Sequence, residues 1–250
     1  MINNLPIGHL KICSGDMGEM LEFIDGRISE NRRIYCIPLN LIKYVVSQKD
    51  IKLKESINAA DLVISDGISI VWMSRRLGYR DVRRVTGIDL AEALISSAGK
   101  KGWKFFFLGA SSDNLHRAID NLRKKLGNIN LVGYHHGFFK TEESQDLVDY
   151  INGTKADILF LGLGMPQKEY FIHDYFDKMA VKFCLPVGGA FDIWAEAKKR
   201  APQMIQKIGL EWLYRSLYDS TKVLNIARYG LIFFKDFLFN KNEAYPRCWR

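Results

Sequence analysis

Short apolar runs of strand length alternate with longer segments of helical period along most of the chain. The apolar runs are Arg33–Pro38, Asp61–Ser65, Lys104–Gly109, Asn130–Tyr134, Asp157–Gly164 and Lys182–Val187. The segments of helical period lie between them, at Asn40–Lys49, Ile68–Leu77, Ile88–Lys101, Asp113–Leu126, Glu142–Ile151 and Gln167–Lys178. Parallel strands need crossover connections, and continuous apolar strands need cover on both faces. The alternation therefore predicts an α/β fold with a mainly parallel, Rossmann-like sheet covered by helices.

The pattern changes at Pro202, where one long helical stretch rich in Trp, Tyr, Leu and Phe replaces the alternation. We therefore expect an α/β domain over residues 1–201 and a helical appendage over residues 202–250. The apolar part Val223–Phe239 is interrupted by three charged residues, Arg228, Lys235 and Asp236. A spanning helix needs about 20 mostly apolar residues, so this segment is too interrupted to cross a bilayer. It leaves open an amphipathic helix at a membrane surface and a terminal helix packed on the core or on a second subunit.

The chain carries a formal net charge of +8, from 36 Lys and Arg against 28 Asp and Glu. Such a surplus indicates an anionic partner: nucleic acid, an acidic lipid surface or a phosphorylated substrate. The opening residues lack the features of a secretory signal, which predicts that the chain stays in the cytoplasm. The scattered cysteines show no CxxC or Cys/His spacing, so we expect reduced, buried thiols. They are Cys13, Cys36, Cys184 and Cys248.

Polar and glycine residues cluster in the loops that follow the predicted strands. In sheets of this kind, ligands bind beyond the carboxyl ends of the strands, where helix N-termini present free N–H groups and a partial positive charge. The loops contain Asn40, Asp66-Gly67, Gly109–Asp113, Gly162–Pro166 and Gly188–Asp192. We therefore expect the functional site at this edge of the sheet.

Asp66 follows an apolar strand and precedes Gly67, which places its carboxylate at the ligand edge of the sheet instead of in the core. A carboxylate at this place can act as a general base. Aspartate is also among the best helix N-caps, so Asp66 could instead only cap the helix that begins at Ile68. Taken alone, the local pattern slightly favours the cap.

Two glycine loops suggest nucleotide chemistry without deciding it. Gly109–Asp113 follows a strand and opens a helix, which suits a ribose or a phosphate. Gly162-Leu-Gly164 resembles the start of the dinucleotide fingerprint GxGxxG, but Gln167 stands where the third glycine belongs, so turn chemistry explains it equally well. A nicotinamide-dependent oxidoreductase on a doubly wound sheet therefore stays open. The basic tail keeps open a non-enzymatic nucleic-acid or membrane-binding module.

No two aspartates lie two residues apart, so the chain lacks the DxD motif with which many nucleotide-sugar enzymes hold a divalent metal. We therefore expect no metal site and no cofactor. Backbone amides and basic side chains would then have to stabilise the negative charge of a leaving group. Basic side chains are, however, more often ordinary surface charges. The candidates are Arg84, Lys168, Arg200 and Arg215.

Seven segments stand in a fixed order over roughly residues 10–230. They are Leu62–Gly67, Arg84–Leu90, Phe107–Gly109, Gly164–Pro166, Gly188–Asp192, Arg200–Pro202 and Gly209–Arg215. In this order they resemble the WecG/TagA/CpsF family of glycosyltransferases. The resemblance implies inverting transfer of a sugar from a UDP-sugar to a polyprenyl-diphosphate-linked saccharide, in the synthesis of teichoic acid, capsule or exopolysaccharide. It also implies a cytoplasmic protein, peripheral on the inner face of the cell membrane and without a nucleic-acid partner, while homo-oligomerisation stays open.

The resemblance assigns roles to individual residues. The family's aspartate after the second strand deprotonates the acceptor hydroxyl, and it falls on Asp66. Two of the family's arginines fall on Arg84 and Arg200, which would meet the donor phosphates or the acceptor diphosphate. The family's C-terminal appendage contacts the membrane and contributes arginines to the active site, here Arg215 and Arg228. The other substrate-binding candidates are Asn40, Gly109, Gly164, Lys168, Glu169, Gly188 and Asp192.

The chain departs from the family pattern at three places. Pro38 replaces the threonine of a Thr-x-Asn element whose Asn40 is kept. Lys168 replaces the glutamine that usually precedes Glu169. Tyr218–Lys222 stands where a Glu-Pro-x-Arg element usually follows. Because sugar-facing positions have changed, the donor sugar stays open between a neutral hexose, such as glucose, and a uronic acid that Lys168 could pair with.

Overall fold

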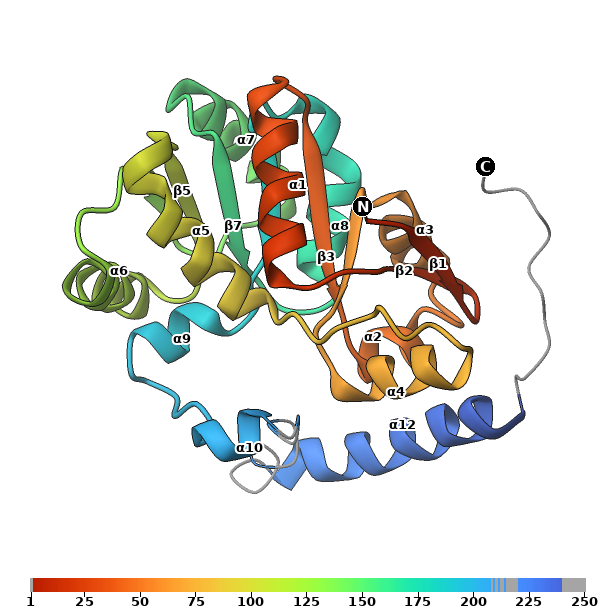
Figure 1. Ribbon diagram of the computed structural model, residues 1–250. Coiled ribbons are helices and arrows are strands. Elements are labelled where there is room, and N and C mark those ends of the chain that lie inside the picture. The colour runs from red at the N-terminus through yellow and green to blue at the C-terminus, as the bar shows by residue number, and fades with distance from the viewer. Residues whose placement is uncertain (1, 208, 210, 212–213, 215–219, 240–250) are drawn as a thin grey trace.

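The computed structural model describes residues 2–207, 209, 211, 214 and 220–239, with only the backbone described at residues 100, 207, 220–227 and 239. Its centre is a six-stranded parallel sheet in the order β4-β3-β8-β7-β5-β6 (Figure 1). The strands are β3 (Ile34–Leu39), β4 (Leu62–Ser65), β5 (Phe105–Gly109), β6 (Leu131–His135), β7 (Ile158–Gly162) and β8 (Phe183–Pro186). The predicted parallel α/β sheet is confirmed, and each of these strands coincides with a predicted apolar run.

Helices cover both faces of the sheet (Figure 1). One apolar core includes residues of α1 (Met17–Ser29), α5 (Gly87–Lys101), α6 (Ser112–Leu126) and α9 (Ala190–Trp194). The other includes residues of α2 (Leu41–Val46), α3 (Ile51–Ala59), α4 (Ile68–Arg76), α7 (Ser144–Gly153) and α8 (Gln167–Tyr175). Successive residues of β5 divide between the two cores: Phe106 packs in one and Phe107 in the other. This alternation is why the strands are apolar along their whole length.

The strands end together, so the loops that follow them share one edge. Leu39 at the end of β3 lies opposite Ser65 at the end of β4. Gly109 at the end of β5 lies opposite Gly162 at the end of β7. The polar loops that the sequence singled out therefore converge at the carboxyl edge of the sheet, as predicted for a ligand site.

Three elements near the N-terminus were absent from the predicted set. An antiparallel hairpin joins β1 (Asn4–Ile7) to β2 (Leu10–Cys13). Helix α1 follows it, and Asp16 begins this helix with a capping box completed by Glu19. The third element is α3, which connects α2 to β4. The hairpin extends the fold beyond the plain alternation of strands and helices that the sequence pattern indicated.

The appendage contains α10 (Gln203–Lys207) and α12 (Ser220–Phe239). Helix α12 lies along α2, and Phe233 is buried there with its ring 5.6 Å from that of Tyr44 in an edge-on arrangement. One face of α12 is thus packed on the core, as in the alternative of a terminal helix that packs on the domain. Leu231 and Phe234 of the same helix are exposed. Among the helices of the described residues, none combines the length and apolar content needed to cross a bilayer. The domain boundary at residue 202 stays a prediction.

Cys13, Cys36 and Cys184 are buried free thiols, as expected, and Cys248 lies outside the described residues. Burial raises the pKa of the Cys36 and Cys184 thiols well above the ordinary value, which keeps them protonated and unreactive. These cysteines are therefore apolar parts of the core.

Candidate functional site

Asp66 lies at the carboxyl end of β4 and is half-buried. Its main-chain N–H donates to the carbonyl of Leu39, 3.0 Å away, which holds the loop against the end of β3. The N-cap of α4 is Gly67, and no side chain caps this helix, so Asp66 is not its cap. Instead, Asp66 Oδ1 accepts a hydrogen bond from the main-chain N–H of Gly87, 3.2 Å away, at the start of α5. The carboxylate thus lies at a helix N-terminus, where the helix dipole favours negative charge.

Gly87 is packed too closely for a side chain. A Cβ at this position would lie 3.0 Å from Pro38 Cγ and 3.3 Å from the carbonyl oxygen of Pro186. The start of α5 is therefore wedged between the ends of β3 and β8, with Asp66 beside it. This close packing fixes the carboxylate relative to three strands.

Asn40 lies beside the Asp66 loop. Its side-chain oxygen caps α2 by accepting a hydrogen bond from the N–H of Lys43, 3.1 Å away. A Cβ on Gly67 would approach the Cα and Cβ of Asn40 to 3.4 Å, which shows that the two loops are in contact. The structure therefore brings Asn40 and Asp66 together, as the sequence predicted.

Arg84 ties the Asp66 loop to the appendage. Its Nε donates to the carbonyl of Asp66 at 3.2 Å, one terminal nitrogen donates to the carbonyl of Gln206 at 2.7 Å, and the other pairs with Glu211 at 2.8 Å. Because these contacts occupy three of its five N–H donors, Arg84 has a positioning role in this structure. Gly209 continues the contact, since a Cβ there would strike Ile68 at 2.4 Å.

Arg200 contacts the first turn of α5. It pairs with Asp89 at 2.6 Å, and Asp89 in turn accepts a hydrogen bond from Thr86, the N-cap of α5, at 2.6 Å. The Nε of Arg200 is buried and has no hydrogen-bond partner within the described residues. A buried unpaired donor is costly, so this N–H is suited to an anionic ligand at the α5 N-terminus.

Lys168 and Glu169 open α8 and are both buried. The ammonium of Lys168 lies 3.3 Å from Glu169 Oε1, and Lys43 approaches the same oxygen to 2.9 Å. Burial lowers the pKa of Lys168 to about 8, because the ammonium loses its water, and the charge of Lys43 adds to this effect. Glu169 and Asp66 act in the opposite direction, which places Lys168 within electrostatic reach of Asp66.

The remaining glycine candidates are explained by packing and turns. A Cβ on Gly109 would strike the backbone of Gly162 at 2.5 Å, and one on Gly162 would strike the ring of Phe191 at 2.2 Å. Gly188 has a φ of +54°, which favours glycine, and Gly164 is exposed. The Gly162-Leu-Gly164 run is therefore accounted for without a dinucleotide.

The structure does not gather every candidate around Asp66. Asp192 on α9 accepts a hydrogen bond from Asn114 of α6 at 2.9 Å and pairs with Lys198, and no contact among the described residues joins it to Asp66. Arg228 is exposed on α12. Arg215 lies outside the described residues. The core of the candidate site is thus Asn40, Asp66, Arg84, Lys168 and Arg200.

A cavity of about 670 Å³ lies at the opposite edge of the sheet, at the beginning of β3 and β4. Its lining includes Lys11, Arg27 and Arg33, and it includes none of the predicted site residues. The guanidinium of Arg33 is already occupied by three backbone carbonyls. This cavity is therefore separate from the cluster of chemistry-bearing side chains at the carboxyl edge.

The sequence pattern of the Glycosyl transferase WecG/TagA/CpsF family matches residues 5–243, nearly the whole chain. The protein belongs to this family. It is therefore a glycosyltransferase, and the match decides against both the oxidoreductase and the non-enzymatic binding module.

For a WecG/TagA/CpsF glycosyltransferase, the cluster offers the required kinds of group in one place. Asp66 supplies a carboxylate at the carboxyl edge of the sheet, and Lys168 supplies a cation within electrostatic reach of it. The N-terminus of α5 and the Nε–H of Arg200, which is unpaired within the described part of the chain, supply donors for negative charge. Among the described residues, no three His, Cys, Asp or Glu side chains gather in a way that could hold a metal ion.

Two side chains of this glycosyltransferase that organise the site were absent from the predicted set. Lys43 is buried against Glu169, and Glu211 anchors Arg84. The sequence does indicate that Lys43 is unusual, because it is the one charged residue in the apolar segment Leu41–Val46. Glu211 lies within a family segment, but its partner is far away in the sequence, and local pattern does not reveal such a pair.

The low pKa of Lys168 makes the stability of this glycosyltransferase depend on pH in a defined direction. Between about pH 8 and 10.5, the ordinary pKa of a lysine, the unfolded chain keeps the Lys168 proton while the folded chain has released it. Unfolding then takes up a proton, so this residue makes stability rise with pH in that window. We expect the wild type to gain on the order of 2–3 kcal/mol relative to Lys168→Met between pH 8 and pH 10.5.

Urea unfolding of both proteins over this pH range measures the gain. Lys125→Met, which removes an exposed lysine paired with Glu92, is the matched control and should track the wild type. Parallel curves for the wild type and Lys168→Met would show that Lys168 titrates as an ordinary lysine.

Proposed function

We propose that this glycosyltransferase moves a hexose-type sugar, with inversion, from a UDP-sugar to a polyprenyl-diphosphate-linked saccharide in exopolysaccharide, capsule or teichoic acid synthesis. The observation that carries the proposal is the placement of the Asp66 carboxylate at the N-terminus of α5, beside Asn40 and within reach of Lys168. A base next to donors for a diphosphate is the arrangement that such a reaction needs.

The mechanism is a single displacement. The acceptor hydroxyl oxygen attacks the anomeric carbon and forms the new glycosidic bond, while the bond from that carbon to the UDP oxygen breaks on the opposite face. Asp66 takes the hydroxyl proton as the attack proceeds. Its Oδ1 is held by Gly87, and Oδ2 receives no hydrogen bond from the described part of the chain, so Oδ2 is the oxygen that takes the proton.

The departing UDP carries the negative charge that develops in the transition state. We assign its stabilisation to the Lys168 ammonium, the free Nε–H of Arg200 and the N-terminal amides of α5. In this proposal no divalent metal is required, so turnover should persist in EDTA. Loss of turnover in EDTA that Mg²⁺ or Mn²⁺ restores would contradict this part of the proposal.

Ligand binding separates this function from nicotinamide chemistry without an acceptor. UDP should raise the melting temperature of the protein in proportion to the logarithm of its concentration above Kd, and NAD should leave it unchanged. A shift with NAD and none with UDP would contradict the proposal. Arg200→Met should weaken the UDP-induced shift, because the buried donor at the α5 N-terminus is lost.

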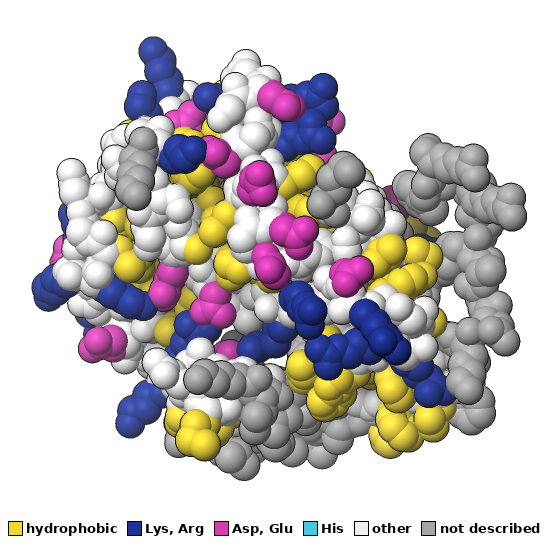
Figure 2. Space-filling model, in the orientation of Figure 1, with side chains coloured by type: hydrophobic (Ala, Val, Ile, Leu, Met, Phe, Trp, Pro, Cys, Tyr) yellow, Lys and Arg dark blue, Asp and Glu magenta, His cyan; other side chains and the backbone are white. Residues whose placement is uncertain are grey.

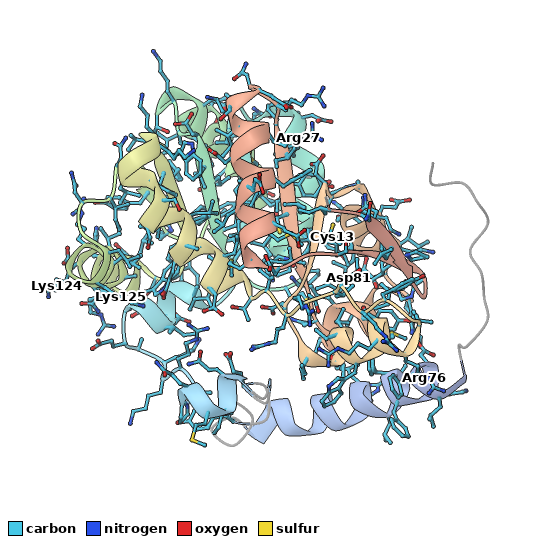
Figure 3. All side chains as sticks on the ribbon, in the orientation of Figure 1. Cys13, Arg27, Arg76, Asp81, Lys124 and Lys125 are labelled. Atoms are coloured by element: carbon cyan, nitrogen blue, oxygen red, sulfur yellow. The ribbon has the colours of Figure 1, made fainter. Side chains whose placement is uncertain are left out.

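We propose further that the protein binds the inner face of the cell membrane through a surface that we call the α4–α12 surface. It consists of Trp72, Leu231, Phe234, Leu238, Arg76, Arg228 and Lys235. Arg76 joins its two helices by lying over the ring of Phe237 at 4.9 Å and donating to the carbonyl of Leu238 at 3.1 Å (Figure 3). Figure 2 shows basic side chains next to hydrophobic ones over this part of the molecule.

The α4–α12 surface suits a lipid-linked acceptor. Leu231 is 74% exposed, Phe234 56% and Trp72 49%, so apolar side chains protrude where Lys and Arg can meet acidic head groups. Figure 1 shows α12 at the same end of the molecule as α4, α9 and α10, the end to which the strand-end loops lead. An acceptor held in the membrane would therefore approach Asp66 from the side on which the protein binds.

Replacing Leu231 and Phe234 together with glutamate should weaken binding to anionic lipid vesicles at least about tenfold, because two apolar side chains no longer insert. Vesicle co-sedimentation measures this. Phe138→Glu changes a phenylalanine that is 75% exposed, more than Phe234, and that lies outside the α4–α12 surface, so this variant should bind like the wild type. Equal binding by all three proteins would contradict the placement of this surface.

A further inference from the structure

Three charged side chains meet in the interior near the end of β3, and we call them the Lys43 cluster: Lys43, Lys168 and Glu169. Their exposed fractions are 4%, 6% and 0%. Glu169 has no hydrogen-bond partner for Oε2 within the described residues, and the two ammonium groups approach its Oε1. Charges buried to this extent are costly, so each depends on the others for neutralisation.

Lys43 connects the cluster to the loop that carries Asn40. Its ammonium donates to the carbonyl of Pro38 at 2.6 Å and pairs with Glu169 at 2.9 Å. Its main-chain N–H donates to the side-chain oxygen of Asn40 at 3.1 Å. One residue therefore holds the end of β3, the N-cap of α2 and the start of α8 in a fixed relation. The first two of these segments contact the Asp66 loop.

The distances divide the charges unevenly. Lys43 lies 0.4 Å closer to Glu169 than Lys168 does, at 2.9 Å against 3.3 Å. Lys43 is therefore the somewhat stronger partner of Glu169, and the two ammonium groups together carry one more charge than Glu169 can neutralise. The Asp66 carboxylate lies within electrostatic reach of Lys168 and can balance part of this surplus. The charged groups that act on Lys168 come from three elements: Lys43 of α2, Glu169 of α8 and Asp66 after β4.

We propose that Lys43 is a positioning residue of the glycosyl-transfer site: it holds Glu169 so that Lys168 stays free to face Asp66 and the departing diphosphate. The inference rests on the proposed function, because it gives Lys168 a task in the transfer step. Lys43 itself touches no substrate. Without Lys43, Lys168 becomes the sole charged partner of Glu169 among the described residues and is drawn away from Asp66.

The role predicts a change in pH dependence that simple loss of packing would not give. The charge of Lys43 lowers the pKa of Lys168, so its removal must raise that pKa. Transfer by the wild type should decline above about pH 8, where Lys168 loses its proton. In Lys43→Met this decline should move upward by roughly one pH unit, while turnover at pH 7 falls about tenfold because Lys168 no longer faces Asp66.

The experiment compares Lys43→Met, Lys168→Met and the double variant by UDP release between pH 6 and pH 10. In the Lys168→Met background, Lys43→Met should cause no further loss, because it acts through Lys168. Lys52→Met removes a half-exposed lysine paired with Asp174 across α3 and α8 and is the matched control, with an unchanged profile. An alkaline decline that stays in place in Lys43→Met, or a full further loss in the double variant, would overturn the inference.

A second readout is independent of transfer. The rise in stability that Lys168 causes above pH 8 should begin at higher pH in Lys43→Met, as measured by urea unfolding. If Lys43→Met does not fold, Lys43→Gln, which keeps an N–H donor for the Pro38 carbonyl, replaces it. An unmoved unfolding profile overturns the coupling of Lys43 to Lys168 even with full activity. A wild type that releases UDP from no donor overturns the proposed function instead.

Discussion

Asp66→Asn should lower turnover at least about a hundredfold, which is the usual scale of a general-base contribution, while UDP binding stays nearly unchanged. Asparagine keeps the shape of the side chain and an oxygen for the Gly87 N–H, so the loop should keep its position. It has no basic oxygen to take the acceptor proton. Initial rates of UDP release and the UDP-induced shift of the melting temperature measure the two effects separately.

Asp81→Asn provides the matched control for this substitution. Asp81 is an exposed aspartate on the loop between α4 and α5 (Figure 3), so the same chemical change there should leave turnover unaltered. Near-normal transfer by Asp66→Asn would show that another group takes the proton. A parallel loss of UDP binding would show that Asp66 holds the donor instead.

Gly109→Ala should destabilise the protein by on the order of 3 kcal/mol or more, because the new methyl group has no space and the backbone is unfavourable for it. Its Cβ would lie 2.5–2.7 Å from three backbone atoms of Gly162. Backbone atoms cannot relieve such a clash by rotating, as the end of a flexible side chain can. The φ of +144° adds strain for any residue with a side chain. Urea unfolding at pH 7 measures the loss.

Gly99→Ala is the control for Gly109→Ala. Gly99 lies within α5, is exposed, and a Cβ there would meet nothing within 4 Å. Alanine favours helix, so this variant should match the wild type or gain up to about 1 kcal/mol. Equal stabilities of the two variants would show that β5 and β7 separate at their ends without cost, and that the glycine loops do not need their close packing.

The sheet was predictable because its strands are buried on both faces. A strand such as β5, with the sequence Phe-Phe-Phe-Leu-Gly, can be predicted from its own residues, because a short run that is apolar at every position is typical of a strand buried on both faces. Strand β1 contains Asn4 and Pro6 and is partly exposed, so it carried no such signal. Helix α1 buries Met20, Ile24 and Ile28 at intervals of four, and the capping box at Asp16 could have revealed it.

The candidate site was predictable to the extent that topology fixes it. Asp66 follows a strand, and strand ends share an edge, so its place followed from the alternation alone. The partners of Arg84 could not be predicted in this way. Gln206 and Glu211 come more than a hundred residues later in the sequence and meet Arg84 only in the folded chain. The approach of Lys43 and Lys168 to the same oxygen of Glu169 likewise arises only when α2 and α8 come together in the folded chain.

Transfer of a sugar from a UDP-sugar by the Asp66 site is the core of the proposed function. A screen of UDP-sugars, including neutral hexoses and uronic acids, against a short-chain prenyl-diphosphate-linked saccharide tests it by UDP release. We expect the wild type to release UDP with at least one donor, only when the acceptor is present, and with formation of an inverted glycosidic bond. Release by Asp66→Asn at the wild-type rate, or no release from any UDP-sugar in the presence of acceptor, would contradict the claim.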